Sequence, residues 1–213
     1  AQYGRDLAGI GLDTWGVDSA LLDRNGALVG NPYHYRDSRT DGMYAEAFRR
    51  VPREEIFDYT GIQFMEINTL YQLLSMVVRR SPALEVAESL VMIPDLFNYW
   101  LTGRIACEFS DATTSQCYDP RSGAWSKELL ERLGIPTHIF REVVPTGTTL
   151  GALSTLVGDE VGLGPVPVVA PACHDGNACL AAWRESDAKA PWRPARSSRS
   201  SPRTCTPRPP CLQ

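Results

Sequence analysis

Four short, continuous apolar runs punctuate the first 183 residues. They are residues 9–12, 19–22, 89–93 and 166–170. Each run is shorter than a typical helix and rich in aliphatic or β-branched side chains, so each predicts a buried strand. The Asn25-Gly26 pair, a frequent two-residue turn, predicts a hairpin in which residues 27–30 return as a further strand.

Helix-like spacing fills the segments between these runs. Asn68 and Thr69 suit the start of a helix with Leu70, Leu73, Leu74 and Val77 on one face. Pro94 favours the first turn of another helix, and Gly103 its end. Further helices are expected after Asp37-Ser38, over residues 125–133 and over residues 177–183. Strands that alternate with helices predict an α/β domain with a mixed sheet.

Composition narrows the class of protein only a little. The 213 residues are 43% hydrophobic with a formal charge of -4, which allows one sizeable core and gives no general attraction to nucleic acid. No apolar stretch approaches the ~20 residues of a membrane span, and the first residues do not resemble a signal peptide. Six scattered cysteines contain no Cys-x-x-Cys pair, so no metal site is predicted. We therefore expect a cytoplasmic protein without a membrane partner.

The composition changes abruptly at Arg184. Residues 184–213 are dense in Arg, Pro and Ser and nearly free of large aliphatic side chains, which predicts a disordered tail after a domain of residues 1–183. A basic arm for nucleic acid and a frame-shifted translation are the alternative interpretations of this tail.

Two loops combine residue types that could carry chemistry, each at the end of a predicted strand. In residues 13–18, Trp15 offers an apolar face beside carboxylates and Gly16 allows close approach of a ligand; a packed hairpin loop is the alternative. In the second loop, Asp175 follows His174 and could accept a proton from a substrate hydroxyl, or could merely cap the next helix. The polar run from Asp111 to Thr114 could line a cleft or form an ordinary loop. No glycine-rich phosphate loop is present, so spacing predicts no nucleotide site.

Taken together, these blocks resemble the FGGY carbohydrate kinases, and most closely the rhamnulokinase branch of that family. The blocks that carry the resemblance are Gly11-Leu12-Asp13-Thr14-Trp15-Gly16-Val17-Asp18, Tyr35-Arg36-Asp37-Ser38-Arg39-Thr40, Gly61-Ile62-Gln63-Phe64 with Asn68-Thr69-Leu70-Tyr71-Gln72-Leu73, the stretch from Pro94 to Gly103, and His174-Asp175. The resemblance implies an actin-like, ribonuclease-H-like fold, of which this chain holds the first, sugar-binding domain.

The resemblance also implies roles for individual residues. Asp175 would be the general base in ATP-dependent phosphorylation of the C1 hydroxyl of L-rhamnulose. The residues expected to bind this ketose are Gly16, His174 and Gly176, together with Trp15, Asn68 and Gln72. Mg-ATP would be bound by the complete enzyme, with most of its site outside this chain.

Three departures from the family pattern qualify this expectation. The opening hairpin of the family would precede residue 1, the ATP-binding domain would follow residue 183, and Gly176 stands where the family usually has Thr. We therefore expect little kinase activity from this chain alone. Another FGGY sugar or polyol kinase and a non-catalytic sugar-binding protein remain the alternatives.

Overall fold

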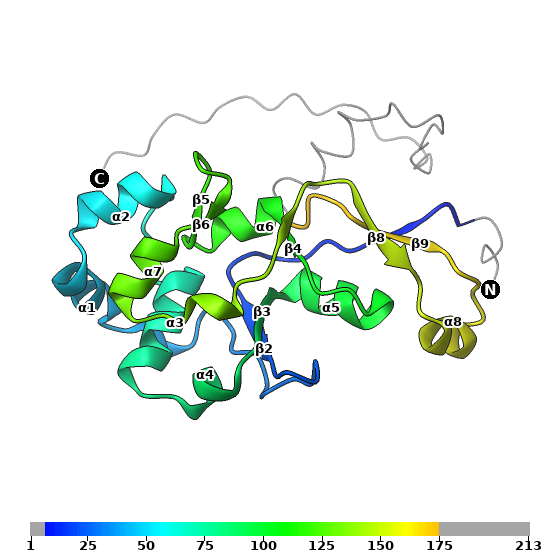
Figure 1. The fold of residues 1–213 in the computed structure, drawn as a ribbon, viewed down its shortest axis with the longest axis horizontal. Helices are drawn as coiled ribbons and strands as arrows, with labels where there is room; N and C mark the ends of the chain where they lie inside the picture. The colour runs from blue at the N-terminus through cyan, green and yellow to red at the C-terminus, as the bar shows by residue number, and fades with distance from the viewer. Residues whose placement is uncertain (1–6, 175–213) are drawn as a thin grey trace, which may run out of the picture.

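A computed structural model describes residues 7–174 of the chain (Figure 1). A group of helices occupies one side of the molecule in this view, and a small sheet occupies the other. The tail beyond residue 183 and the helix predicted over residues 177–183 lie outside the described residues. None of the described helices is long and apolar enough to cross a membrane.

The sheet is mixed, as the sequence predicted. Strand β1 (Ile10–Gly11) pairs in parallel with β9 (Pro167–Ala170), and β8 (Thr148–Ala152) pairs with β9 in the antiparallel sense. Helix α8 (Thr155–Val161) connects β8 to β9, and α5 (Ile93–Thr102) packs against both strands. The parallel pairing of β1 with β9 brings the loops that follow these two strands to the same edge.

Strand β2 (Ser19–Leu22) has a different main partner from the one predicted. It pairs in the antiparallel sense with β3 (Ser89–Met92), all four residues of which are buried. The predicted turn is present, because the Asp23 carboxylate accepts hydrogen bonds from the backbone N–H groups of Asn25 and Ala27. The predicted hairpin is present, since the backbone N–H of Asp23 donates to the carbonyl oxygen of Ala27, that of Val29 donates to the carbonyl oxygen of Leu21, and Leu22 forms a bridge with Leu28. The predicted strand over residues 27–30 is shorter than expected, because the chain bends at residues 29 and 30.

Capping residues and apolar spacing in the sequence predicted the positions of several helices correctly. Helix α3 (Thr69–Val78) follows Asn68, and α5 has proline in its first turn and ends at Gly103 with a left-handed φ of 79°. Helix α7 (Lys127–Leu133) begins two residues later than predicted, because Trp125 pairs within a small hairpin. The helices that the sequence analysis did not identify are α2 (Arg53–Thr60), α4 (Pro82–Val86), α6 (Phe109–Thr114) and α8.

The remaining elements are short. They are the 3₁₀ turns η1 (Ser38–Thr40) and η2 (Thr137–Ile139), helix α1 (Met43–Arg50), and the strands β4 (Cys107–Glu108), β5 (Tyr118–Asp119), β6 (Ala124–Trp125) and β7 (Val143–Val144).

The main hydrophobic core lies among the helices and not under the mixed sheet. Helices α1, α2, α3 and α7 surround fully buried side chains that include Ile56, Tyr71, Leu74 and Leu130. Each such side chain contributes about 1.5–3 kcal/mol by leaving water. The core beneath the sheet is much smaller and contains Val144, Leu150 and Cys173 among its few members. The sheet edge that bears the candidate loops therefore depends more on polar contacts than the helical side does.

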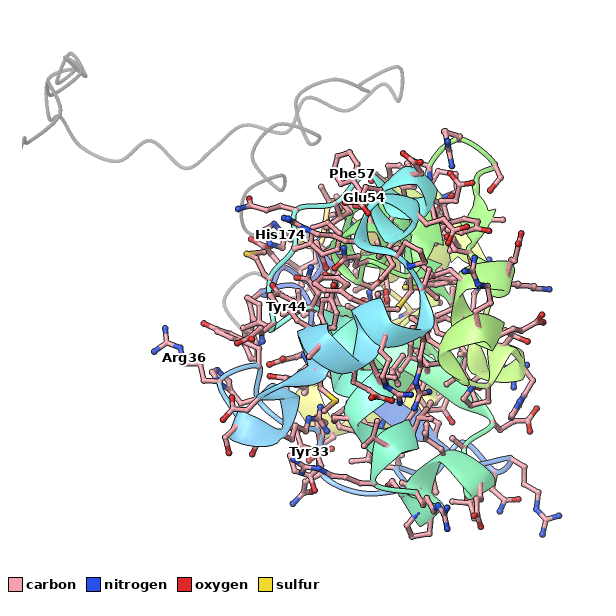
Figure 2. All side chains as sticks on the ribbon, turned by 90° about the vertical axis from the view of Figure 1, so that its left-hand side faces the viewer. Tyr33, Arg36, Tyr44, Glu54, Phe57 and His174 are labelled. Atoms are coloured by element: carbon pink, nitrogen blue, oxygen red, sulfur yellow. The ribbon has the colours of Figure 1, made fainter. Side chains whose placement is uncertain are left out.

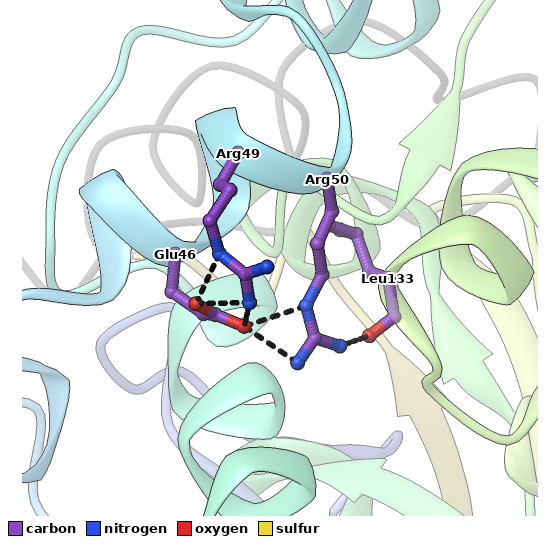
Figure 3. Close-up of polar contacts among 4 residues, drawn as sticks. All are labelled: Glu46, Arg49, Arg50 and Leu133. Carbon is purple, nitrogen blue, oxygen red and sulfur yellow. Dashed lines mark hydrogen bonds and ion pairs between the residues drawn. The ribbon is translucent and has the colours of Figure 1, made fainter.

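A clamp between α1 and α7 closes the helical core (Figure 3). The Arg50 guanidinium pairs with Glu46 one turn earlier and donates a hydrogen bond to the carbonyl oxygen of Leu133, the last residue of α7. Arg49 pairs with the same carboxylate but contacts no other helix in this cluster. A cation at a helix C-terminus also opposes the negative end of the helix dipole.

We predict that Arg50→Met lowers the free energy of unfolding by about 1–2 kcal/mol, because it removes a charge-assisted hydrogen bond to a helix-terminal carbonyl. Arg49→Met is the matched control, since the Arg49 side chain is 71% exposed and its ion pair should contribute less than about 0.5 kcal/mol. Urea unfolding followed by circular dichroism measures both. Equal losses in the two variants would contradict a specific role for the contact with Leu133.

Candidate functional site

The two loops predicted from the sequence meet in the structure. The backbone N–H of Thr14 donates to the carbonyl oxygen of Cys173 at 3.0 Å, and Thr14 forms a parallel bridge with His174. The segment that follows β1 thus runs alongside the segment that follows β9. The structure therefore brings Trp15, Gly16 and His174 into one neighbourhood, whereas Asp175 and Gly176 lie outside the described residues.

Gly16 sits where no side chain fits. A Cβ at this position would lie 2.7 Å from Cδ2 of His174, 2.8 Å from Oγ1 of Thr114 and 3.1 Å from Oδ1 of Asp111. Separations below 3.0 Å are closer than carbon atoms tolerate, so only glycine allows the loop to approach these three side chains. Gly16 is itself buried, so these three side chains occupy the space next to its backbone.

Trp15 is held at one edge of its ring. The indole Nε1–H donates to Oδ2 of Asp18 at 2.8 Å, and Asp18 is itself buried. Trp15 nevertheless remains 43% exposed, with the His34 ring centroid 6.5 Å away in a tilted arrangement. An exposed indole fixed by a buried carboxylate can offer its face to the C–H groups of a sugar.

The side-chain amides of Asn68 and Gln72 are buried next to the loop of residues 13–18, and Gln72 contacts it directly. Nε2 of Gln72 lies within hydrogen-bonding distance of the carbonyl oxygens of Val17 and Ile67. Nδ2 of Asn68 donates to the carbonyl oxygen of Gln63 and to the side chain of Gln116. Both amides are almost fully buried, and the structure shows them hydrogen-bonded to groups of the protein. Their contact with the sugar stays a prediction.

The Glu108 carboxylate holds the segment that follows β9. Glu108 is fully buried at the N-cap of α6, where Oε2 accepts from the backbone N–H of Ser110 at 2.9 Å and of Asp111 at 3.3 Å. The same oxygen accepts from the backbone N–H of Cys173 at 3.3 Å. Its other oxygen, Oε1, accepts from the Thr146 hydroxyl. One side chain thus connects α6, the loop before β8 and the residue that precedes His174.

Asp111 and Thr114 border the site from α6. Oγ1 of Thr114 accepts from the backbone N–H of Val17 at 3.2 Å. Oδ2 of Asp111 is buried without a hydrogen-bond partner in the structure. The sequence analysis predicted that these residues line a cleft or form an ordinary loop. It did not predict their helix, because six residues are too few to show the spacing of apolar side chains that marks a helix.

Buried carboxyl groups surround the base of the site. Burial raises the pKa of Asp95 to about 7, although hydrogen bonds from the Cys107 side chain and the Glu108 backbone N–H oppose the rise. Burial, and next the neighbouring charge of Asp95, raise the pKa of Asp111 well above its ordinary value. Protonated carboxyl groups here would limit the negative charge below the loop of residues 13–18.

The described residues do not form a metal site. Residues 7–174 contain no group of three or more His, Cys, Asp and Glu side chains that could hold a metal ion. Near Gly16, the Glu108 carboxylate accepts hydrogen bonds from backbone N–H groups, and Oδ1 of Asp111 accepts one from the Thr114 hydroxyl.

Comparison with known proteins agrees with this geometry. The model of the FGGY family of carbohydrate kinases, N-terminal domain, matches residues 3–181, so the chain belongs to that family. A rhamnulokinase of Pectobacterium atrosepticum is 43% identical over 166 residues, which are 78% of this chain and 32% of that protein. A rhamnulokinase of Bacteroides thetaiotaomicron is 38% identical over 182 residues, or 85% of this chain and 38% of that protein. The chain thus spans about a third of the length of these relatives.

Solved structures share the fold. A carbohydrate kinase from Novosphingobium aromaticivorans superposes with a TM-score of 0.71 at 27% identity, over 84% of this chain and 38% of that one. A xylulose kinase from Lactobacillus acidophilus gives the same TM-score at 17% identity, over 77% and 34% of the two chains. The expected actin-like fold is therefore confirmed for the part of the chain that the structure describes.

We predict that Gly16→Ala costs about 1–3 kcal/mol of unfolding free energy, because the new Cβ must displace His174 and Thr114. Gly164→Ala is the control, since a Cβ there meets nothing within 4 Å. Urea unfolding gives the stabilities, and the His174 ring signals in an NMR spectrum report the displacement. Unchanged His174 signals in Gly16→Ala would contradict the close contact.

We predict that stability falls between about pH 5 and pH 7 in part because of Asp95. Its folded-state pKa exceeds the ordinary value of 3.8, so the folded chain binds the extra proton in this range and loses stability as the pH rises through about 7. The slope from one such group approaches about 1.4 kcal/mol per pH unit.

Asp95→Asn should flatten this slope when unfolding is measured by urea titration at several pH values. Asp119→Asn is the control: its backbone hydrogen bond from Arg121 lowers the pKa of Asp119, so its titration falls below this window. A slope that is unchanged in Asp95→Asn would exclude Asp95 as its source.

Proposed function

We propose that the chain forms the sugar-binding part of a kinase that transfers the γ-phosphoryl group of ATP to the C1 hydroxyl of L-rhamnulose. The observation that carries this proposal is the meeting of the loop of residues 13–18 with His174, next to Gly16. The names of the relatives support the choice of sugar, because those at 43% and 38% identity are called rhamnulokinases.

The proposed chemistry assigns the base to Asp175, the residue that follows His174 in the chain. In the proposed step the C1 oxygen forms a bond to the γ-phosphorus while the bond from that phosphorus to the bridging oxygen breaks, and ADP leaves. The hydroxyl proton passes to the Asp175 carboxylate. Positioning by the surrounding residues and electrostatic stabilisation supply most of the rate in phosphoryl transfer.

The described residues have a binding role in this scheme. In the proposal the Trp15 face receives the C–H surface of the ketose. Gly16 allows its loop to lie against His174, and His174 and Gly176 are proposed to contact the sugar. Glu108 positions the segment that leads to Asp175 and does not touch the sugar. Mg-ATP is the proposed phosphoryl donor.

A different sugar is the competing proposal, because xylulose kinases share the fold. Calorimetric titration of the chain with L-rhamnulose should give saturable binding, with L-fuculose, a stereoisomer of the same formula, bound at least about tenfold more weakly. Trp15→Ala should weaken L-rhamnulose binding about tenfold or more. Trp100→Ala is the matched control, since Trp100 is similarly exposed, at 47%, but lies on α5. Equal affinity for D-xylulose would favour the competing sugar.

The role of Asp175 can be tested without ATP. We predict that Asp175→Asn changes the affinity for L-rhamnulose but leaves that for its 1-deoxy analogue unchanged, because only the former presents a hydroxyl at C1. The interaction energy from this double-mutant cycle should be about 0.5–3 kcal/mol. A value of zero would remove Asp175 from contact with the C1 hydroxyl. It would leave a non-catalytic sugar-binding protein as the better description.

A further inference from the structure

A pocket that is open to solvent lies on the other side of Gln72 from the sugar loop. This cavity of about 410 Å³ is formed between β2, residues 29–33 and α3. Tyr33 at its border lies well below His174 in the view of Figure 2, so the cavity does not reach His174, although Gln72 lines it. Its volume is within the range of small-molecule sites.

The cavity contains a buried cation. Arg39 is only 7% exposed and lines the space, and none of the ion pairs among the described residues includes it. Burial lowers the pKa of Arg39, while the charges of Asp37 and Asp18 partly oppose that effect. The guanidinium nonetheless remains charged, because arginine is not deprotonated in proteins.

Neutral groups satisfy only part of the hydrogen-bonding capacity of the Arg39 guanidinium. Nη2 donates to Oε1 of Gln72 at 2.5 Å, and the guanidinium carbon lies 4.1 Å from the centre of the Tyr33 ring. Nε of Arg39 is buried and donates to no acceptor. A buried charge without an anionic partner is costly, and an unmade hydrogen bond adds to that cost. An anion in the adjoining space would offset the buried charge.

The rest of the wall is suited to an aliphatic body. Leu21, Val29, Leu73 and Met76 line the cavity, and the hydroxyl-bearing Ser19 and Ser81 lie at its border. A single cation among aliphatic side chains matches a small molecule with one negative charge and a branched hydrocarbon part. A multiply charged ion without an apolar part would leave most of this wall unused.

We propose that this cavity is a second ligand site, which binds a short branched carboxylate with its carboxyl group on Arg39 and its aliphatic body against Leu21, Val29 and Leu73. The proposed site does not require that the chain phosphorylate a sugar. Gln72 joins it to the sugar loop, because its Oε1 contacts Arg39 while its Nε2 contacts the Val17 carbonyl oxygen. Occupancy is therefore expected to shift the NMR signals of the Gln72 side-chain amide.

The test is an NMR titration of the ¹⁵N-labelled chain with 4-methylpentanoate. We expect saturable shifts at Gln72 and the Arg39 Nε–H, with a Kd of about 1 mM or tighter for a ligand of this size. Its neutral isostere 4-methylpentanamide, and inorganic phosphate, should each bind at least about tenfold more weakly. Equal binding of the acid and the amide, or stronger binding of phosphate, would overturn the proposal.

Variants separate the site from general charge effects. Arg39→Met should weaken 4-methylpentanoate binding at least about tenfold. Arg49→Met removes an exposed arginine elsewhere and should change nothing. Ala83→Leu keeps Arg39 but fills part of the cavity that Ala83 lines, so it should also weaken binding even if Arg39→Met fails to fold. Unchanged affinity in Ala83→Leu, or no saturable shift in the wild-type chain, would show that the cavity does not bind this class of ligand. L-Rhamnulose binding should persist whichever result is obtained.

Discussion

The buried carboxylate of Glu108 is the interaction on which the candidate site depends. It accepts hydrogen bonds from the start of α6, from the Thr146 hydroxyl and from the backbone N–H of Cys173. Hydrogen bonds to a charged group contribute about 1.5–3 kcal/mol each, more than those between neutral groups. Because the hydrophobic core under the mixed sheet is small, this polar junction adds to apolar packing in fixing the segment that follows β9.

The position of that strand end has consequences for the sugar loop. Once Cys173 is fixed, its carbonyl oxygen receives the backbone N–H of Thr14, and His174 comes against Gly16. The buried carboxyl groups of Asp95 and Asp111 lie close to the same junction, and burial raises the pKa of each above its ordinary value. Burial thus disfavours the charged form of both groups beneath the sugar loop.

Sequence patterns predicted the elements whose signals are local. Asn68 marks the start of α3, Gly103 the end of α5, and continuous apolar runs mark the strands. The pairing of β2 with β3 was not predictable in this way, because it depends on contacts between distant segments. The roles of Glu108 and Asp111 also escaped prediction, since a six-residue helix has no clear period and a buried carboxylate is defined only by the donors around it.

Hydrogen exchange at the Thr14 and Cys173 amides tests most directly whether Glu108 holds the candidate site together. Glu108→Gln keeps the size of the side chain but replaces one accepting oxygen with a donor. Both amides should then exchange at least about tenfold faster, as expected for the loss of ~1.4 kcal/mol or more of local stability. Amides of α3 and α7, in the helical core, should keep their protection. Unchanged exchange at Thr14 and Cys173 would contradict the central place given to this carboxylate.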